Sequence, residues 1–188
     1  MINDIHFSNP PQLETERLLL RPLTLDDAPT MQRIRSDERV MAFMDSERHT
    51  TLAHSIQFIT ENLDAYQNKK GLFWALTLKT TGVFIGDFSY WDINHKNARA
   101  EIGYTLRPDY WGNGYMTEAL QTLLLFCFQD LNLHSIEANI NPSNSNSRKL
   151  LQRLGFVKEA YFRENYYYNG QFIDSEIYSL LEWDLKGQ

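Results

Sequence analysis

The residues with the clearest chemical signal are two glycines in the segment 110–119, which joins a strand-like run to a strongly periodic helical run. Gly112 and Gly114 lack a Cβ atom, so an anion can approach their backbone closely. The first turn of the following helix offers free N–H groups and the positive end of the helix dipole. This pattern predicts a seat for a pyrophosphate group. Its residues are Gly112, Asn113, Gly114, Tyr115, Met116 and Thr117.

A glycine pair between a strand and a helix can also serve the turn alone. The sequence contains no GxxxxGK[ST] motif, and it contains no GxGxxG motif with an acidic residue closing a following strand. A P-loop and a Rossmann dinucleotide site are therefore excluded. The glycine pair by itself leaves ligand binding and a purely conformational role open.

Periodic segments on both sides must position these glycines. Residues 98–106 alternate with period two, which predicts a strand. One face of this strand carries Ala98, Ala100, Ile102, Tyr104 and Leu106, and the other carries Arg99, Glu101, Gly103 and Thr105. Helical spacing after Gly114 predicts a buried face formed by Met116, Ala119, Leu120, Leu123, Leu124, Cys127 and Leu131. Cys127 is thus expected in the core.

The rest of the chain alternates between the two patterns. Further strands are expected at residues 17–23, 72–79, 83–91, 135–140, 156–162 and 174–183, and further helices at 24–35, 36–44, 51–68 and 144–154. This order predicts an α/β (α+β) fold with a mixed, mostly antiparallel sheet of about seven strands and helices on both faces. Residues 1–12 are expected to form an arm without structure of its own, and residues 13–188 a single domain.

Composition narrows the classes of function. The net charge of −6 disfavours nonspecific binding to nucleic acid or to an anionic membrane. The five histidines show no metal-ligand spacing, so no metal is expected. A single cysteine excludes an internal disulfide, and no segment approaches membrane-spanning length. These features predict a soluble cytoplasmic protein.

Four motifs in order resemble those of a known family. Residues 106–119 read LRPDYWGNGYMTEA, residues 141–147 read NPSNSNS and residues 154–156 read LGF, with TERLLLRP at 15–22 and DSEIYSLL at 174–181. Together they closely resemble the GNAT N-acetyltransferases, and within them the branch of the ribosomal-protein N-terminal acetyltransferases RimJ and RimL. The resemblance covers nearly the whole chain. It implies the GNAT fold and acetyl-CoA as cosubstrate.

The resemblance also implies how acetyl-CoA is held. The family pattern is Gln/Arg-x-x-Gly-x-Gly/Ala, and only Gly114 matches it, because Trp111 and Met116 occupy the other two positions. Since backbone groups bind the phosphates, these departures leave the seat intact. In the family, the strand before the seat splays away from the next parallel strand, which implies a pantetheine groove between residues 102–106 and 138–141. The further cofactor contacts it implies are Tyr104, Thr105, Leu106, Asn141, Asn144 and Ser147.

Candidates for proton transfer follow from the same resemblance. Ser147 is implied to lie near the sulfur as the acid, since Leu151 stands where many GNAT enzymes have a tyrosine. Asn144 has an equally good explanation as a helix N-cap, with Ser147 three positions on. Glu101 is a candidate base, and the alternative for it is a solvated or salt-bridged carboxylate on a strand. Glu164 is a second candidate base, in a loop after the sixth strand.

The expected activity is the transfer of an acetyl group from acetyl-CoA to a primary amine, directly in a ternary complex. A protein α-amine has a pKa of about 8 and a lysine about 10.4, so an N-terminal acceptor needs less help to lose its proton. A protein N-terminus is therefore the first expectation, and the resemblance implies ribosomal proteins as the first class of acceptor. A small-molecule amine (a polyamine, an amino acid or an aminoglycoside) is the alternative acceptor, and a noncatalytic acyl-CoA sensor is the alternative function. The oligomeric state is open, with a homodimer one option.

Overall fold

One sheet of eight strands runs through the protein in a computed structural model that describes residues 2–186. The strands are β1 (Leu13–Glu14), β2 (Leu18–Pro22), β3 (Leu72–Leu78), β4 (Phe84–Asn94), β5 (Arg99–Leu106), β6 (Ser135–Ile140), β7 (Val157–Tyr168) and β8 (Gln171–Leu181). Their order in the sheet is β1-β2-β3-β4-β5-β6-β8-β7. Only β5 and β6 pair in parallel. The predicted mixed, mostly antiparallel sheet is confirmed, and β1 is the strand added to the predicted seven.

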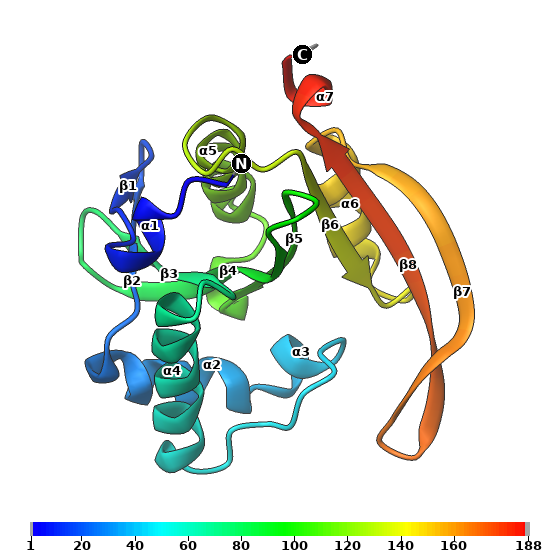
Figure 1. The fold of residues 1–188 in the computed structure, drawn as a ribbon. Helices are drawn as coiled ribbons and strands as arrows, with labels where there is room; N and C mark the ends of the chain where they lie inside the picture. Colours follow the sequence, from blue (N-terminus) through cyan, green and yellow to red (C-terminus); the bar gives the residue numbers. More distant parts are fainter. Residues whose placement is uncertain (1, 187–188) are drawn as a thin grey trace.

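Helices cover both faces of this sheet. They are α1 (Ile5–Ser8), α2 (Ala28–Ser36), α3 (Glu38–Met41), α4 (Leu52–Gln67), α5 (Tyr115–Gln129), α6 (Ser145–Arg153) and α7 (Glu182–Lys186), with short 3-10 turns at Leu25–Asp27 and Pro108–Tyr110. In Figure 1, α5 lies on one side of the central strands, and α2 and α4 lie on the other. Within residues 2–186, no helix is long and apolar enough to span a membrane.

The buried face of α5 is the one that its sequence predicts. All seven apolar positions of the pattern are buried, and Leu120, Leu123 and Leu124 are completely inaccessible to solvent. Phe126 packs edge to face on Trp74 of β3, with 5.6 Å between the ring centroids. Cys127 is also in this core, and burial raises the pKa of its thiol well above the ordinary value. The helix is therefore fixed to the sheet along its length, which holds its N-terminus in place.

β5 and β6 part after a short stretch of pairing. They pair only over Arg99 to Glu101 on β5 and Ser135 to Glu137 on β6, although β5 continues to Leu106 and β6 to Ile140. The expected splay between these two strands is confirmed. It leaves the facing backbone edges of both strands free of each other at the carboxyl ends.

Two boundary predictions are wrong. The strands expected to end at residue 162 and to begin at residue 174 extend to Tyr168 and from Gln171, so the turn is only Asn169-Gly170, both with positive φ. Such a pair favours a tight hairpin, and the tyrosines before it suit a strand. Residues 1–12 are also not without structure, because Ile5–Ser8 form α1 and its Phe7 is buried in the core.

Two leucines of α5 test how far this helix depends on packing. Leu120 is fully buried, whereas Leu125 is 45% exposed. Leu120→Ala is expected to lower the free energy of unfolding by about 2–5 kcal/mol, because it leaves a cavity under the sheet. Leu125→Ala, the same substitution on the same helix, should lower it by about 0.5 kcal/mol or less. Urea unfolding monitored by circular dichroism measures both, and equal losses would contradict the packing described here.

Candidate active site

The predicted anion seat has the backbone geometry that such a seat needs. Gly112 and Gly114 have φ angles of 76° and 78°, a left-handed conformation that favours glycine, and Gly114 is the N-cap of α5. The first hydrogen bond of the helix runs from the Glu118 N–H to the Gly114 carbonyl, 3.0 Å. Helix geometry therefore leaves the N–H groups of Tyr115, Met116 and Thr117 directed at whatever lies before the helix.

Arg17, at the start of the sheet, braces this seat. Its Nε donates to the Glu118 carboxylate over 2.6 Å, and its Nη1 donates to the Asn113 carbonyl over 3.0 Å. Its guanidinium carbon also lies 4.3 Å from the centre of the Tyr115 ring. Glu118 accepts from the Thr15 hydroxyl as well, and these bonds lower the pKa of Glu118 although burial opposes them. Glu118 thus anchors the helix N-terminus to the chain before β2.

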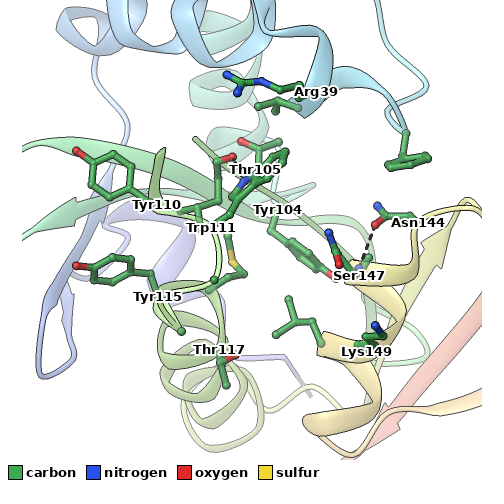
Figure 2. A pocket seen from close by; sticks show the side chains of 18 of the residues that line it. Arg39, Tyr104, Thr105, Tyr110, Trp111, Tyr115, Thr117, Asn144, Ser147 and Lys149 are labelled. Carbon is green, nitrogen blue, oxygen red and sulfur yellow. Dashed lines mark hydrogen bonds between the residues drawn. The ribbon is translucent and has the colours of Figure 1, made fainter. Parts of the chain in front are cut away.

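A cleft of about 620 Å³ opens in front of the seat, between α3, β5, α5 and α6. Most predicted cofactor-binding residues line it: Tyr104, Thr105, Leu106, Gly112, Gly114, Tyr115, Met116, Thr117, Asn144 and Ser147. Figure 2 shows the tyrosines of the seat at one end and Ser147 at the other. Asn113 and Asn141 are not among its lining residues, and Asn141 lines a neighbouring cleft instead.

The cleft is also lined by basic residues that sequence reasoning missed. Arg39 comes from α3, and Lys149 and Arg153 come from α6. Lys149 and Arg153 stand four positions apart, so they share a helix face with Asn146 and Leu150, which also line the cleft. That spacing was a usable signal. Three cations around one opening favour a ligand that carries phosphates.

The N-terminus of α6 places Ser147 beside the parted strands. Asn144 caps this helix, because its Oδ1 accepts from the Ser147 N–H over 3.0 Å. The capping explanation of Asn144 is therefore confirmed, and its side chain still lines the cleft. The Ser147 hydroxyl lies 2.6 Å from the hydroxyl of Tyr104, a residue of β5. Both residues are predicted cofactor contacts, but nothing in the sequence predicts that they touch each other.

Glu101 lies where β5 and β6 separate. It occupies the last paired position of β5, opposite Glu137, and does not line either cleft. Burial, together with the negative charge of Asp92, raises the pKa of the Glu101 carboxyl to about 7. A hydrogen bond from the backbone of Asn139 on β6 opposes this rise. A carboxyl group with a pKa near neutrality can accept a proton and release it again under working conditions.

Glu164 has a different setting from Glu101. It lies in β7 and not in a loop, at an irregularity between Phe162 and Tyr166, where it has a φ of 51°. Its N–H donates to the Asp174 carboxylate over 2.7 Å. Glu164 is exposed and lines neither cleft. The structure therefore does not bring it together with Ser147, and it gives Asp174 a structural role at the irregularity.

A second cleft of about 610 Å³ adjoins the first and shares Phe43 and Met44 with it. It lies between the segment that joins α3 to α4 and the turn of the β7–β8 hairpin, and Glu38, Asp45 and Glu47 line it together with Arg48. Across it, the Tyr166 hydroxyl donates to Asp45 over 2.8 Å. Burial raises the pKa of the Asp45 carboxyl. Arg48 pairs with Glu38 over 2.5 Å, which leaves Asp45 and Glu47 as the excess carboxylates of the lining, and these favour a cationic ligand. In the described part of the chain, no cluster of His, Cys, Asp and Glu could hold a metal ion.

Comparison with known proteins agrees with this geometry. Residues 17–157 match the family described as Acetyltransferase (GNAT) domain. The chain belongs to the GNAT acetyltransferase family. It is 33% identical over 172 residues to the uncharacterized N-acetyltransferase YoaA of Bacillus subtilis (strain 168), covering 92% of this chain and 97% of YoaA.

Solved structures of GNAT enzymes have the same fold. RimJ of Mycobacterium smegmatis, solved in complex with CoA-disulfide, superposes with a TM-score of 0.82 at 25% identity, over 89% of this chain and 83% of RimJ. The ribosomal-protein-S5-alanine acetyltransferase of Vibrio fischeri superposes with a TM-score of 0.81 at 26% identity, over 92% of this chain and 97% of its own. The predicted resemblance to the RimJ and RimL branch is confirmed, and the chain is a GNAT N-acetyltransferase.

The seat can be tested with a glycine substitution. Gly114→Ala is expected to raise the Kd for CoA several-fold, because alanine disfavours the left-handed conformation by about 1–2 kcal/mol and moves the first turn of α5. Gly82→Ala is the matched control, since Gly82 has a φ of 68° with open space around it in the turn between β3 and β4. Isothermal titration calorimetry should show weaker binding for Gly114→Ala alone. Equal Kd values for the two variants would contradict the assignment of the seat.

Proposed function

We propose that the protein transfers the acetyl group of acetyl-CoA directly to the α-amine of a protein N-terminus, with ribosomal proteins as the first class of acceptor. The observation that carries the proposal is the course of the first cleft. It runs from the N-terminus of α5 to Ser147 at the parted strands, and it meets the second, acidic cleft at Phe43 and Met44.

The first cleft suits acetyl-CoA. The N–H groups at the start of α5 would hold the pyrophosphate, and Lys149 and Arg153 supply positive charge for phosphate groups nearby. The unpaired edges of β5 and β6 offer N–H and C=O groups to the amides of pantetheine. An N–H of Tyr104, Thr105 or Leu106 would stabilise the oxyanion that forms when an amine attacks the thioester.

The second cleft suits the acceptor. Glu38, Asp45 and Glu47 outnumber Arg48 in its lining, so it attracts an ammonium group. Near neutral pH a protein α-amine is protonated on arrival and loses its proton with little help, since its pKa is about 8. The similarity to the S5-alanine acetyltransferase of Vibrio fischeri supports an N-terminal α-amine as the acceptor.

Two groups move protons in this proposal. Glu101, whose carboxyl pKa is raised to about 7 by burial and by Asp92, accepts the proton that the amine loses, directly or through a water. The amine nitrogen forms a bond to the acetyl carbon, and the C–S bond then breaks with its electron pair on sulfur. Ser147 lines the cleft and protonates that sulfur. Glu101 is preferred to Glu164 because it is half-buried where β5 and β6 part, whereas Glu164 is exposed on β7.

A small-molecule amine is the second candidate acceptor. The same acidic lining of Glu38, Asp45 and Glu47 would attract a polyamine or an aminoglycoside, which carry several positive charges. The two candidate acceptors differ in the groups that the protein must recognise. A peptide acceptor needs its α-amine, whereas a polyamine has no peptide chain to bind along the cleft.

The acceptor can be identified by thiol release from acetyl-CoA. The assay compares N-terminal peptides of ribosomal proteins, the same peptides with a blocked N-terminus, polyamines and aminoglycosides. Turnover is expected on the free peptides and should disappear when the N-terminus is blocked. Turnover confined to polyamines or aminoglycosides would establish the second candidate. Absence of turnover on every amine, with acetyl-CoA binding retained in calorimetry, would contradict both.

Glu101 can be tested by the pH dependence of the rate. Its carboxyl is protonated below its raised pKa of about 7, so kcat/KM should rise with pH through about 7 as the base becomes available. Glu101→Gln should lower kcat/KM by about 100-fold and leave only the rise near pH 8 that belongs to the amine. Glu164→Gln should keep the wild-type profile. If Glu164→Gln gives the loss and Glu101→Gln keeps the wild-type profile, the base is Glu164.

A further inference from the structure

Tyr104 and Ser147 meet across the gap between β5 and α6. Tyr104 lies on the part of β5 that no longer pairs with β6, and its hydroxyl is 2.6 Å from that of Ser147 in the first turn of α6. In Figure 2 the Tyr104 ring extends from the floor of the cleft toward Ser147. The distance is that of a short, well-formed hydrogen bond between hydroxyl groups.

The distance allows either hydroxyl to donate in this bond, and the chemistry of the two groups favours Tyr104 as the donor. Burial raises the pKa of its phenol to about 12, with the Ser147 hydrogen bond acting in the opposite direction. The phenol therefore keeps its proton throughout the pH range in which a carboxylate or an α-amine changes charge. A phenol is also more acidic than an aliphatic hydroxyl, which favours Tyr104 as the donor and Ser147 as the acceptor of the shared bond.

Accepting this hydrogen bond restricts the direction in which the Ser147 hydroxyl can donate its own hydrogen. A serine hydroxyl has one hydrogen and two lone pairs. When one lone pair accepts from Tyr104, the hydrogen of Ser147 must point elsewhere, and Ser147 lines the cleft with Tyr104. Hydrogen bonds in a chain polarise one another, so a serine that accepts from a phenol is a better donor to a third group.

We propose that Tyr104 is a positioning residue of acetyl transfer, which orients and polarises the Ser147 hydroxyl toward the sulfur of the departing CoA. The inference rests on the proposed function, because it assigns Ser147 the role of acid. The N–C bond forms and the C–S bond breaks. The arriving ammonium group first releases one proton to solvent. The attacking nitrogen then loses a second proton to Glu101, sulfur gains one from Ser147, and solvent returns the proton of Glu101 to Ser147. The phenol of Tyr104 keeps its own proton throughout and acts on the sulfur only through Ser147.

The other tyrosines of the cleft are placed differently. Tyr110 and Tyr115 pack edge to face, with 6.1 Å between their ring centroids, and guanidinium groups lie over both rings. Figure 2 shows these two rings at the far end of the cleft from Ser147. Their place suits the phosphate end of acetyl-CoA, and the Tyr104 hydroxyl alone among these three is bonded to Ser147.

The test removes the hydroxyl oxygen of Tyr104 and that of Ser147 by substitution, first singly and then together. Tyr104→Phe is expected to lower kcat by about 10-fold or more while the KM for acetyl-CoA stays within about twofold, because the ring still packs but Ser147 loses its orienting partner. Ser147→Ala should lower kcat at least as much. The double variant should be no slower than Ser147→Ala, since Tyr104 acts only through Ser147.

Tyr167→Phe is the matched control for this series. Tyr167 is 64% exposed on β7, packs against Phe172 and lines neither cleft. The same oxygen is deleted there, and kcat should not change. The inference would be overturned if Tyr104→Phe kept the wild-type kcat. It would also be overturned if the double variant were slower by the product of the two single effects. In both cases turnover by the wild type would still uphold the proposed function.

A second measurement needs no acceptor. CoA labelled with ¹³C beside its sulfur, bound to the protein and titrated by NMR, reports the pKa of the bound thiol. Ser147 donating to sulfur stabilises the thiolate, so the bound thiol should have a lower pKa in the wild type than in Tyr104→Phe or Ser147→Ala. Equal pKa values in the wild type and Tyr104→Phe would overturn the inference even if no amine were acetylated.

Discussion

The parting of β5 and β6 is the constraint on which the site depends. The two strands pair as far as Glu101 and Glu137, and beyond this point neither strand provides hydrogen-bond partners for the backbone N–H and C=O groups of the other. Unpaired N–H and C=O groups away from water are unfavourable, so the gap favours a ligand that brings amide groups. A fully paired sheet would close the space in which Tyr104 meets Ser147, and it would separate the seat on α5 from the cap of α6.

A buried ionic cluster supports this opening from the opposite face of the sheet. Arg35 of α2 lies 3.6 Å from the carboxylate of Asp87 on β4, and both side chains are almost completely buried. Asp87 also accepts from the Thr105 hydroxyl, and the Arg35 guanidinium lies 3.9 Å from the centre of the Phe58 ring on α4. Because removal of one partner from a buried pair leaves an uncompensated charge, the cluster ties α2 and α4 to β5. Thr105 lines the cleft, so the packing of α2 and α4 influences the position of a residue in the cleft wall.

Local periodicity predicted most of the fold, because it reports which side of an element is buried. The pattern of α5 was right at every apolar position, and the period of residues 98–106 identified β5. The errors fell where periodicity is weak. The β7–β8 hairpin is exposed on much of its length, so its tyrosines follow no simple alternation and its strands were predicted too short. Glu164 was consequently placed in a loop, although it lies on β7.

The sequence by itself determined the backbone of the proposed cosubstrate site, since the positive φ angles of Gly112 and Gly114 and the N-terminus of α5 follow from residue types within a few positions. Only the tertiary structure decided the chemistry. The contact of Tyr104 with Ser147 joins residues 43 positions apart, and the brace of Arg17 on Glu118 spans 101 positions. The raised pKa of Glu101 likewise comes from burial and from Asp92. Hydroxyl orientation and proton affinity depend on neighbours and on exclusion of water, and the order of strands in the sheet, not the local sequence, selects those neighbours.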